Sequence, residues 1–138
     1  MTLVIDASVA IKWVVAEPGT DAALSLRQER LFAPDSLIPE CANVLWKKIV
    51  RRELTESEAL MAARLLERAD VQLQPMRLLL EPAVRLAVSL DHPAYDCVYL
   101  ALAETMDGEL ITADRALHRK VQQAKIAKGR VRLLSGLS

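Results

Sequence analysis

Short apolar runs alternate with stretches of helical periodicity along the chain. The apolar runs predict strands over residues 3–5, 31–33, 109–112 and 131–134, the first of them buried. Alternation with period two, ended by Pro75, predicts another strand over residues 71–74. Helical spacing predicts helices over residues 20–29, 36–52, 56–69, 78–90, 95–106 and 114–123, and another from residue 7 to just before Pro18-Gly19. Such alternation is typical of an α/β fold, so we expect helices on both faces of a mainly parallel central sheet of four to five strands.

Polar residues mark several element boundaries. The segment Thr55-Glu56-Ser57-Glu58 has the order of a capping box, whose first hydroxyl and last carboxylate each accept a free amide at a helix start. Asp35 or Ser36 is expected to cap the start of the helix over residues 36–52. The segment Asp91-His92-Pro93 separates two helices. The helix that follows it, over residues 95–106, is apolar nearly all round, so we expect it in the middle of the domain.

Two aspartates follow predicted strands directly or nearly so. Asp6 comes immediately after residues 3–5, and Asp114 comes two residues after the strand over 109–112. In parallel sheets ligands bind beyond the carboxyl ends of the strands, so both carboxylates are candidates for a common site. Asp at such a position is also a good helix N-cap, and this non-catalytic interpretation is the more frequent one for a single residue.

Two further acids, Glu40 and Asp96, lie in the first turns of apolar helices. A lone carboxylate is costly to bury at the start of the helix over residues 95–106 unless something pairs with it. The alternatives are an N-cap role for Asp96 and a favourable helix-dipole interaction for Glu40. Neither alternative explains why four acids fall at helix and strand ends that face the same way.

Four converging carboxylates favour a bound cation. Two carboxylates roughly 4 Å apart repel each other by roughly 4 kcal/mol at an effective dielectric constant near 20. Oxygen ligands without clustered His or Cys favour Mg²⁺ or Mn²⁺ over zinc. His92 and His118 are accordingly expected to be ordinary surface or loop residues. A cation held by the acids would polarise a phosphodiester and activate water, which favours hydrolysis without a covalent enzyme intermediate.

Composition and charge narrow the class of protein. The 138 residues are 52% hydrophobic with 4 Gly and 6 Pro, so we expect one globular domain over residues 1–138. Cys41 and Cys97 lack the spacing of a zinc or redox motif and are expected as reduced core residues. Neither a secretory signal nor an apolar run long enough to span a bilayer is found, which predicts a cytoplasmic protein without membrane attachment.

Charge is balanced overall, with 18 basic and 18 acidic residues, but it is unevenly distributed. From residue 115 onward the chain has no acid and seven basic residues: Arg115, Arg119, Lys120, Lys125, Lys128, Arg130 and Arg132. Those that follow Asp114 most closely, Arg115, Arg119 and Lys120, are candidate contacts for an RNA phosphate backbone. A solvated charged helix face explains the same pattern, and both interpretations stay open.

Each of the four acids lies in a longer segment, and the four segments are spread over the whole chain. They are Val4-Ile5-Asp6-Ala7-Ser8-Val9 with Lys12-Trp13, Pro39-Glu40-Cys41-Ala42-Asn43-Val44-Leu45-Trp46-Lys47, Tyr95-Asp96-Cys97-Val98-Tyr99-Leu100-Ala101-Leu102-Ala103-Glu104, and Leu110-Ile111-Thr112-Ala113-Asp114. Together they closely resemble those of the PIN-domain nucleases, and most of all the VapC-type toxins of prokaryotic toxin–antitoxin pairs. The resemblance implies a PIN-like three-layer sandwich whose catalytic acids are Asp6, Glu40, Asp96 and Asp114.

The resemblance also implies roles for individual residues. Asp6, Asp96 and Asp114 would bind Mg²⁺ or Mn²⁺, and Glu40 would bind the ion or orient the water. Ser8 and Thr112 would support the acids. Asp91 competes with Asp96 for the third position, but the Tyr-Asp pair at the start of the apolar helix favours Asp96.

The implied function is that of a metal-dependent endoribonuclease toxin. Its substrate would be an RNA such as tRNA or ribosomal RNA, and its partners a cognate antitoxin protein and a second copy in a homodimer. Apolar helix faces near residues 20–29, 37–52 and 56–69 exceed what one core needs, which favours a groove for an amphipathic antitoxin helix.

Several other functions are alternatives to this one. Within the family, the alternatives are a non-toxin RNA-processing nuclease and a catalytically silent module that binds protein or RNA. A receiver-like phosphorylation domain would need a Lys at the end of a late strand, where this chain has Thr112-Ala113-Asp114. A binding module based on base stacking would need exposed aromatic residues, and most of the five here are expected in the core: Trp13, Phe32, Trp46, Tyr95 and Tyr99.

Overall fold

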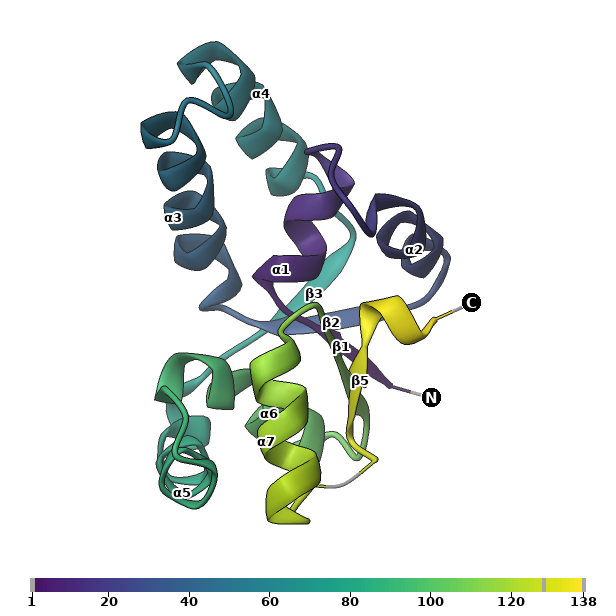
Figure 1. Ribbon diagram of the computed structural model, residues 1–138, viewed down its shortest axis with the longest axis vertical. Coiled ribbons are helices and arrows are strands. Elements are labelled where there is room, and N and C mark those ends of the chain that lie inside the picture. Colours follow the sequence, from purple (N-terminus) through teal and green to yellow (C-terminus); the bar gives the residue numbers. More distant parts are fainter. Residues whose placement is uncertain (1, 128, 138) are drawn as a thin grey trace.

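A five-stranded sheet between two layers of helices forms the protein, in a computed structural model that describes residues 2–127 and 129–137 (Figure 1). The strand order is β3-β2-β1-β4-β5, and every neighbouring pair is parallel. The strands are β1 (Leu3–Ile5), β2 (Leu31–Pro34), β3 (Val71–Gln74), β4 (Glu109–Thr112) and β5 (Val131–Leu133). The predicted parallel sheet is therefore confirmed.

Helices cover both faces of the sheet, as predicted for a three-layer sandwich. Figure 1 shows α1 to α4 on one side of the sheet and α5 to α7 on the other. The helices are α1 (Ala7–Ala10), α2 (Thr20–Ser25), α3 (Leu37–Val50), α4 (Glu56–Glu67), α5 (Leu80–Leu90), α6 (Ala94–Thr105) and α7 (Arg115–Ala124). No helix of the described residues has both the length and the apolar character needed to cross a membrane.

The first two helices are shorter than predicted. After Ala10 the chain continues as a 3₁₀ turn over Ile11–Trp13, and after Ser25 as another over Leu26–Gln28. β-Branched residues lower helix propensity, and Val14-Val15 follow the first turn directly. Gly19 then adopts a φ of 93°, a left-handed conformation that ends any continuous helix before α2 begins.

Of the two predicted helix caps, one is confirmed in full and the other in position only. The Thr55 amide donates to Glu58 Oε1 at 2.8 Å and the Glu58 amide donates to Thr55 Oγ1 at 3.1 Å, which completes the capping box of α4. Ser36 occupies the N-cap position of α3 but makes no capping hydrogen bond through its side chain. Its φ of −61° and ψ of −15° are helical, whereas a capping residue needs extended backbone.

Helix α6 lies against the middle of the sheet, where its residues from Tyr99 to Ala103 are at most 4% exposed. Cys41 and Cys97 are free and buried, as predicted. Burial raises the pKa of the Cys41 thiol to about 12 and that of Cys97 to about 11, so neither forms a reactive thiolate near neutral pH.

The prediction that most aromatic residues lie in the core is wrong for Trp46 and Tyr95, which are 58% and 78% exposed. Cys41 and Leu45, one turn apart, define the buried face of α3. Trp46 follows Leu45 and is therefore rotated by about 100° out of that face. Tyr95 lies in the first turn of α6, before the helix becomes buried at Cys97.

Gly108 is required where β4 begins to pair with β1. A Cβ at this position would lie 2.4 Å from the backbone oxygen of Thr2, which accepts a hydrogen bond from the Glu109 amide at 2.9 Å. We expect Gly108→Ala to lower the free energy of unfolding by about 1–3 kcal/mol, measured by urea denaturation. Gly136→Ala, where the added Cβ meets nothing within 4 Å, is the control and should change stability by less than about 0.5 kcal/mol. Equal stabilities of the two variants would contradict this explanation.

Candidate active site

The candidate site lies where the chain leaves β1 and β4, two neighbouring parallel strands. β1 leads into α1 on one face of the sheet, and β4 leads into α7 on the opposite face (Figure 1). Connections that diverge in this way leave a crevice at the carboxyl ends of the two strands. Asp6 and Asp114 follow these strand ends, as the sequence predicted.

Asp6 is held by hydroxyl groups from both sides of this crevice. Its Oδ1 accepts a hydrogen bond from Ser8 Oγ at 2.5 Å, and its Oδ2 accepts one from Thr112 Oγ1 at 2.5 Å. The register that pairs Ile5 with Ile111 places Thr112 beside Asp6. The predicted support of the acids by Ser8 and Thr112 is thus geometrically in place.

Asp6 also caps α1, because it accepts a hydrogen bond from the Val9 amide at 3.3 Å. Burial raises the pKa of Asp6 to about 6, since loss of hydration outweighs the hydrogen bonds that favour the charged form. The negative charge of Asp96 raises this pKa further. Asp6 is therefore both a helix cap and a carboxylate whose charge is poorly compensated.

Glu40 reaches the same place from the first turn of α3. The Tyr99 hydroxyl, from the buried middle of α6, donates to Glu40 Oε2 at 2.6 Å. The other oxygen, Oε1, is buried and has no hydrogen-bond partner among the described residues. Burial raises the pKa of Glu40, as do the charges of Asp96 and Asp6, while the Tyr99 hydrogen bond lowers it.

Asp96 and Asp114 share one histidine. His92 Nε2 lies 2.7 Å from Asp96 Oδ2 and 3.7 Å from Asp114 Oδ2. Asp114 also caps α7 by accepting the Leu117 amide at 3.1 Å. The N-cap of α6 is Pro93, so the N-cap alternative for Asp96 is wrong.

The four predicted acids line one open cleft of about 1100 Å³, together with Ser8. Asp91, the competitor of Asp96, does not line this cleft; it ends α5 in a left-handed conformation with φ of 50°. The cleft brings together carboxylates from four segments that lie far apart in the sequence.

Residues beyond those predicted also belong to this site. His92 was expected to be an ordinary surface or loop residue; it does lie in a loop, but its side chain is only 6% exposed and contacts two of the acids. Tyr99 was expected only as a core residue. Asn43 and Lys47 line the cleft with Glu40, and the spacing of three and seven residues along α3 could have placed them on its face.

These donors fit a hard divalent cation. The unpaired Glu40 oxygen and the raised pKa of Asp6 both show negative charge that the protein itself does not balance. Ligand atoms of His92, Asp96 and Asp114 lie within 4.8 Å of one another. Asp6 and Glu40 line the same cleft but are not part of this close group. Carboxylate oxygens in this number suit Mg²⁺ or Mn²⁺.

The basic residues after Asp114 do not form one uniform surface. Arg115 and Arg119 are exposed on α7, whereas Lys120 Nζ donates to the backbone oxygen of Asp91 at 2.5 Å. Arg130 pairs with Asp107 and Arg132 with Glu109, at 3.1 and 3.2 Å. Lys128 lies outside the described residues. Arg115 and Arg119 thus remain the most accessible of the candidate RNA contacts.

Comparison with known proteins gives a consistent result. Residues 3–122 match the PIN domain family. The chain is 35% identical over 127 residues to Ribonuclease VapC3 of Pyrobaculum aerophilum, covering 87% of this chain and 95% of that protein. It is 29% identical over 116 residues to Ribonuclease VapC12 of Mycobacterium tuberculosis, covering 83% and 88%.

Two solved structures share the fold. PAE2754 from Pyrobaculum aerophilum matches with a TM-score of 0.73 and 23% identity, over 99% of this chain and 86% of that chain. VapC20 of Mycobacterium tuberculosis, a sarcin-ricin loop cleaving toxin, matches with a TM-score of 0.65 and 16% identity, over 86% and 94%. From the family match and the VapC relatives, we conclude that the chain belongs to the PIN-domain family and is of the VapC type.

Proposed function

We propose that this protein is a Mg²⁺- or Mn²⁺-dependent endoribonuclease and the toxin of a toxin–antitoxin pair. The observation that carries the proposal is the cleft in which four carboxylates from separate segments converge, with one buried Glu40 oxygen left unpaired. The relatives named Ribonuclease VapC3 and VapC12 support RNA as the substrate. The VapC type of these relatives supports the toxin role over a general RNA-processing role.

Different residues would bind the cation and hold its ligands in place. Asp6, Asp96 and Asp114 would hold the cation, with Ser8 and Thr112 fixing both oxygens of Asp6. When bound, the cation supplies positive charge that polarises the phosphodiester and lowers the pKa of an attacking water.

Glu40 is suited to orient that water and accept its proton. Tyr99 fixes one oxygen of Glu40, and the raised pKa of the carboxylate brings it nearer to neutral pH, which favours proton transfer. Water would add to phosphorus and lose its proton to Glu40, while the bond from phosphorus to the leaving oxygen breaks and that oxygen takes a proton from solvent. No covalent enzyme intermediate would form.

The RNA would follow the walls of the cleft. Lys47 and the exposed ring of Tyr95 line it, and a ring in that position can stack on an unpaired base. Arg115 and Arg119 would contact the phosphate backbone beside Asp114, with Lys120 at the edge of this surface. We propose a structured RNA, such as tRNA or ribosomal RNA, as the substrate.

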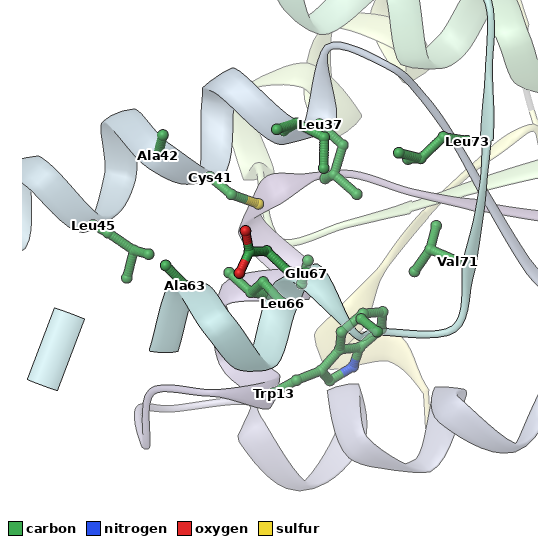
Figure 2. A pocket seen from close by; sticks show the side chains of 13 residues that line it. Trp13, Leu37, Cys41, Ala42, Leu45, Ala63, Leu66, Glu67, Val71 and Leu73 are labelled. Atoms are coloured by element: carbon green, nitrogen blue, oxygen red, sulfur yellow. The ribbon is translucent and has the colours of Figure 1, made fainter. Parts of the chain in front are cut away.

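An apolar pocket of about 300 Å³ is the proposed site for the antitoxin. Figure 2 shows Trp13, Cys41 and Leu66 converging on it, with the Glu67 carboxylate among them. Residues of α1, α3, α4 and β3 line the pocket, whereas α2 contributes none. An amphipathic antitoxin helix would place apolar side chains here and a basic side chain against Glu67.

A second copy of the chain is the proposed partner of α5. Leu80, Val84 and Val88 form a stripe that is 71%, 50% and 77% exposed. Beside the stripe, Glu81 and Arg85 form an ion pair at 2.5 Å. Antiparallel packing of α5 on its copy would bury the stripe and bring each Glu81 near the partner's Arg85, as a two-fold interface requires.

The proposal predicts cleavage that depends on a divalent cation. Purified protein is incubated with total cellular RNA in the presence of Mg²⁺ or Mn²⁺ and, in a parallel reaction, in the presence of excess chelator. We expect discrete RNA fragments with either ion and intact RNA with chelator, because the four acids alone offer no means of polarising the phosphodiester. Cleavage that persists in chelator, or intact RNA under every condition, would contradict the proposed mechanism.

A further inference from the structure

His92 is placed behind the acidic cleft and not on its wall. Its side chain is 6% exposed, whereas those of Asp96 and Asp114 are 42% and 32% exposed. His92 is not among the residues that line the cleft. The imidazole therefore contacts the two acids from the protein side, while the acids themselves remain open to the cleft.

The contact between His92 and Asp96 is a directed hydrogen bond. A carboxylate in its ionised form can only accept, so with Asp96 in that form the 2.7 Å contact places the proton of the imidazole on Nε2. The same nitrogen lies 3.7 Å from Asp114 Oδ2. A single N–H group thus lies beside both carboxylates and occupies Oδ2 of Asp96, which fixes the orientation of that carboxylate.

The backbone around His92 is held by three helices. Its amide donates to Ala87 O of α5 at 3.2 Å, and its carbonyl accepts a weak hydrogen bond from Cys97 Sγ of α6 at 3.9 Å. Lys120 of α7 donates to the carbonyl of the preceding residue, Asp91, at 2.5 Å. Pro93 follows with its φ fixed near −54°. The ring is thus presented to the acids by a firmly anchored loop.

We propose that His92 is a positioning residue for the cation-binding carboxylates. It holds Oδ2 of Asp96 and sets that carboxylate beside Asp114, so that the two acids offer oxygens to one divalent cation without rearranging. His92 itself touches neither the cation nor the RNA. The inference rests on the proposed function, because it takes Asp96 and Asp114 to bind the cation. Hydrogen-bond partners of metal ligands commonly contribute a factor of about 10–100 in metal affinity.

The experiment measures Mn²⁺ binding to the protein without RNA. Isothermal titration and Mn²⁺ electron paramagnetic resonance are applied to the wild type, His92→Leu, His92→Gln and His118→Leu. Leu removes the donor and keeps apolar volume, whereas the Gln amide can donate from nearly the position of Nε2. His118→Leu is the matched control. Among the described contacts, His118 interacts with the acids only through its backbone amide.

We expect His92→Leu to bind Mn²⁺ about 10–100-fold more weakly, while His92→Gln and His118→Leu stay close to the wild type. Circular dichroism checks that each variant is folded; if His92→Leu is not, His92→Met, which also lacks the donor, takes its place in the comparison. Electron spin-echo spectra of the wild-type Mn²⁺ complex should show no directly coordinated nitrogen.

Three results would overturn the inference and leave the proposed function standing. Unchanged Mn²⁺ affinity in folded His92→Leu would show that the hydrogen bond does not position the acids. A directly coordinated nitrogen that disappears in the His92 variants would make His92 a ligand instead. If the hydrogen bond positions the acids, His92→Gln must restore Mn²⁺ binding. A loss of Mn²⁺ affinity in His92→Gln equal to that in His92→Leu would therefore also contradict the inference. Failure of the wild type itself to bind Mn²⁺ would reject the proposed function together with the inference.

Discussion

Replacing Asp96 by Asn is expected to reduce the rate of RNA cleavage by more than about 100-fold. Loss of a residue that only hydrogen-bonds to a metal ligand usually costs about 10–100-fold, and Asp96 is proposed to be a ligand itself. Asn keeps the size of the side chain and its oxygen can still accept from His92, but it lacks the charge that binds a cation. The charge of Asp96 also raises the pKa of Asp6 and Glu40, so its removal relieves repulsion and should leave the protein folded.

The measurement is the initial rate of RNA cleavage at saturating Mn²⁺, accompanied by growth of cells that produce each variant. Asp70→Asn is the matched control, because Asp70 is exposed and does not line the cleft. The wild type and Asp70→Asn should cleave RNA and arrest growth, whereas Asp96→Asn should do neither. Growth arrest by a folded Asp96→Asn protein would reject the catalytic role of the acids.

The metal-free protein is expected to lose stability as pH rises through the range from about 4 to 6. Burial raises the pKa of Asp6 in the folded protein from 3.8 to about 6, so protonated Asp6 favours the folded state and charged Asp6 opposes it. The contribution is fully present below pH 4 and is lost as pH rises through 6. One unit of pKa corresponds to about 1.4 kcal/mol, so this shift amounts to at most about 3 kcal/mol.

An Asp6→Asn variant isolates this effect. With chelator present, urea denaturation at pH 8 should show the variant to be about 2–3 kcal/mol more stable than the wild type, and at pH 4 the difference should nearly vanish. Adding Mn²⁺ at pH 8 should stabilise the wild type and leave Asp6→Asn almost unchanged, because ligand binding favours the folded state. A variant that is less stable than the wild type at pH 8 without metal would contradict the electrostatic explanation.

The parts of the fold that follow from local patterns could be predicted from the sequence. Strands of a parallel sheet are buried on both faces and therefore appear as apolar runs, which located four of the five. The period-two alternation of residues 71–74 located β3. Asp6 and Asp114 could be predicted because their positions follow from strand ends. The lengths of α1 and α2 could not, since β-branched residues and Gly19 tighten or end these helices in ways that apolar spacing does not report.

The remaining part of the site depends on contacts between distant segments. Tyr99 meets Glu40 across 59 positions of sequence, and nothing in the apolar pattern of α6 distinguishes its hydroxyl from that of an ordinary core tyrosine. His92 is only four residues from Asp96, but Pro93 and the loop obscure that proximity. Whether Trp46 and Tyr95 are exposed depends on which face of α3 and of α6 packs against neighbouring elements, which single positions do not reveal.

The pairing of the first strand with the fourth has a consequence for synthesis of the protein. β1 leaves the ribosome first, but its neighbour β4 and the Thr112 hydroxyl that binds Asp6 follow only after more than a hundred further residues. A nascent chain that ends before residue 109 would carry Asp6, Glu40 and Asp96 but neither Thr112 nor Asp114. Long-range pairing of this kind forms late in folding. The proposed site would therefore stay unassembled until β4 and the residues that follow it have been synthesised and have paired with β1.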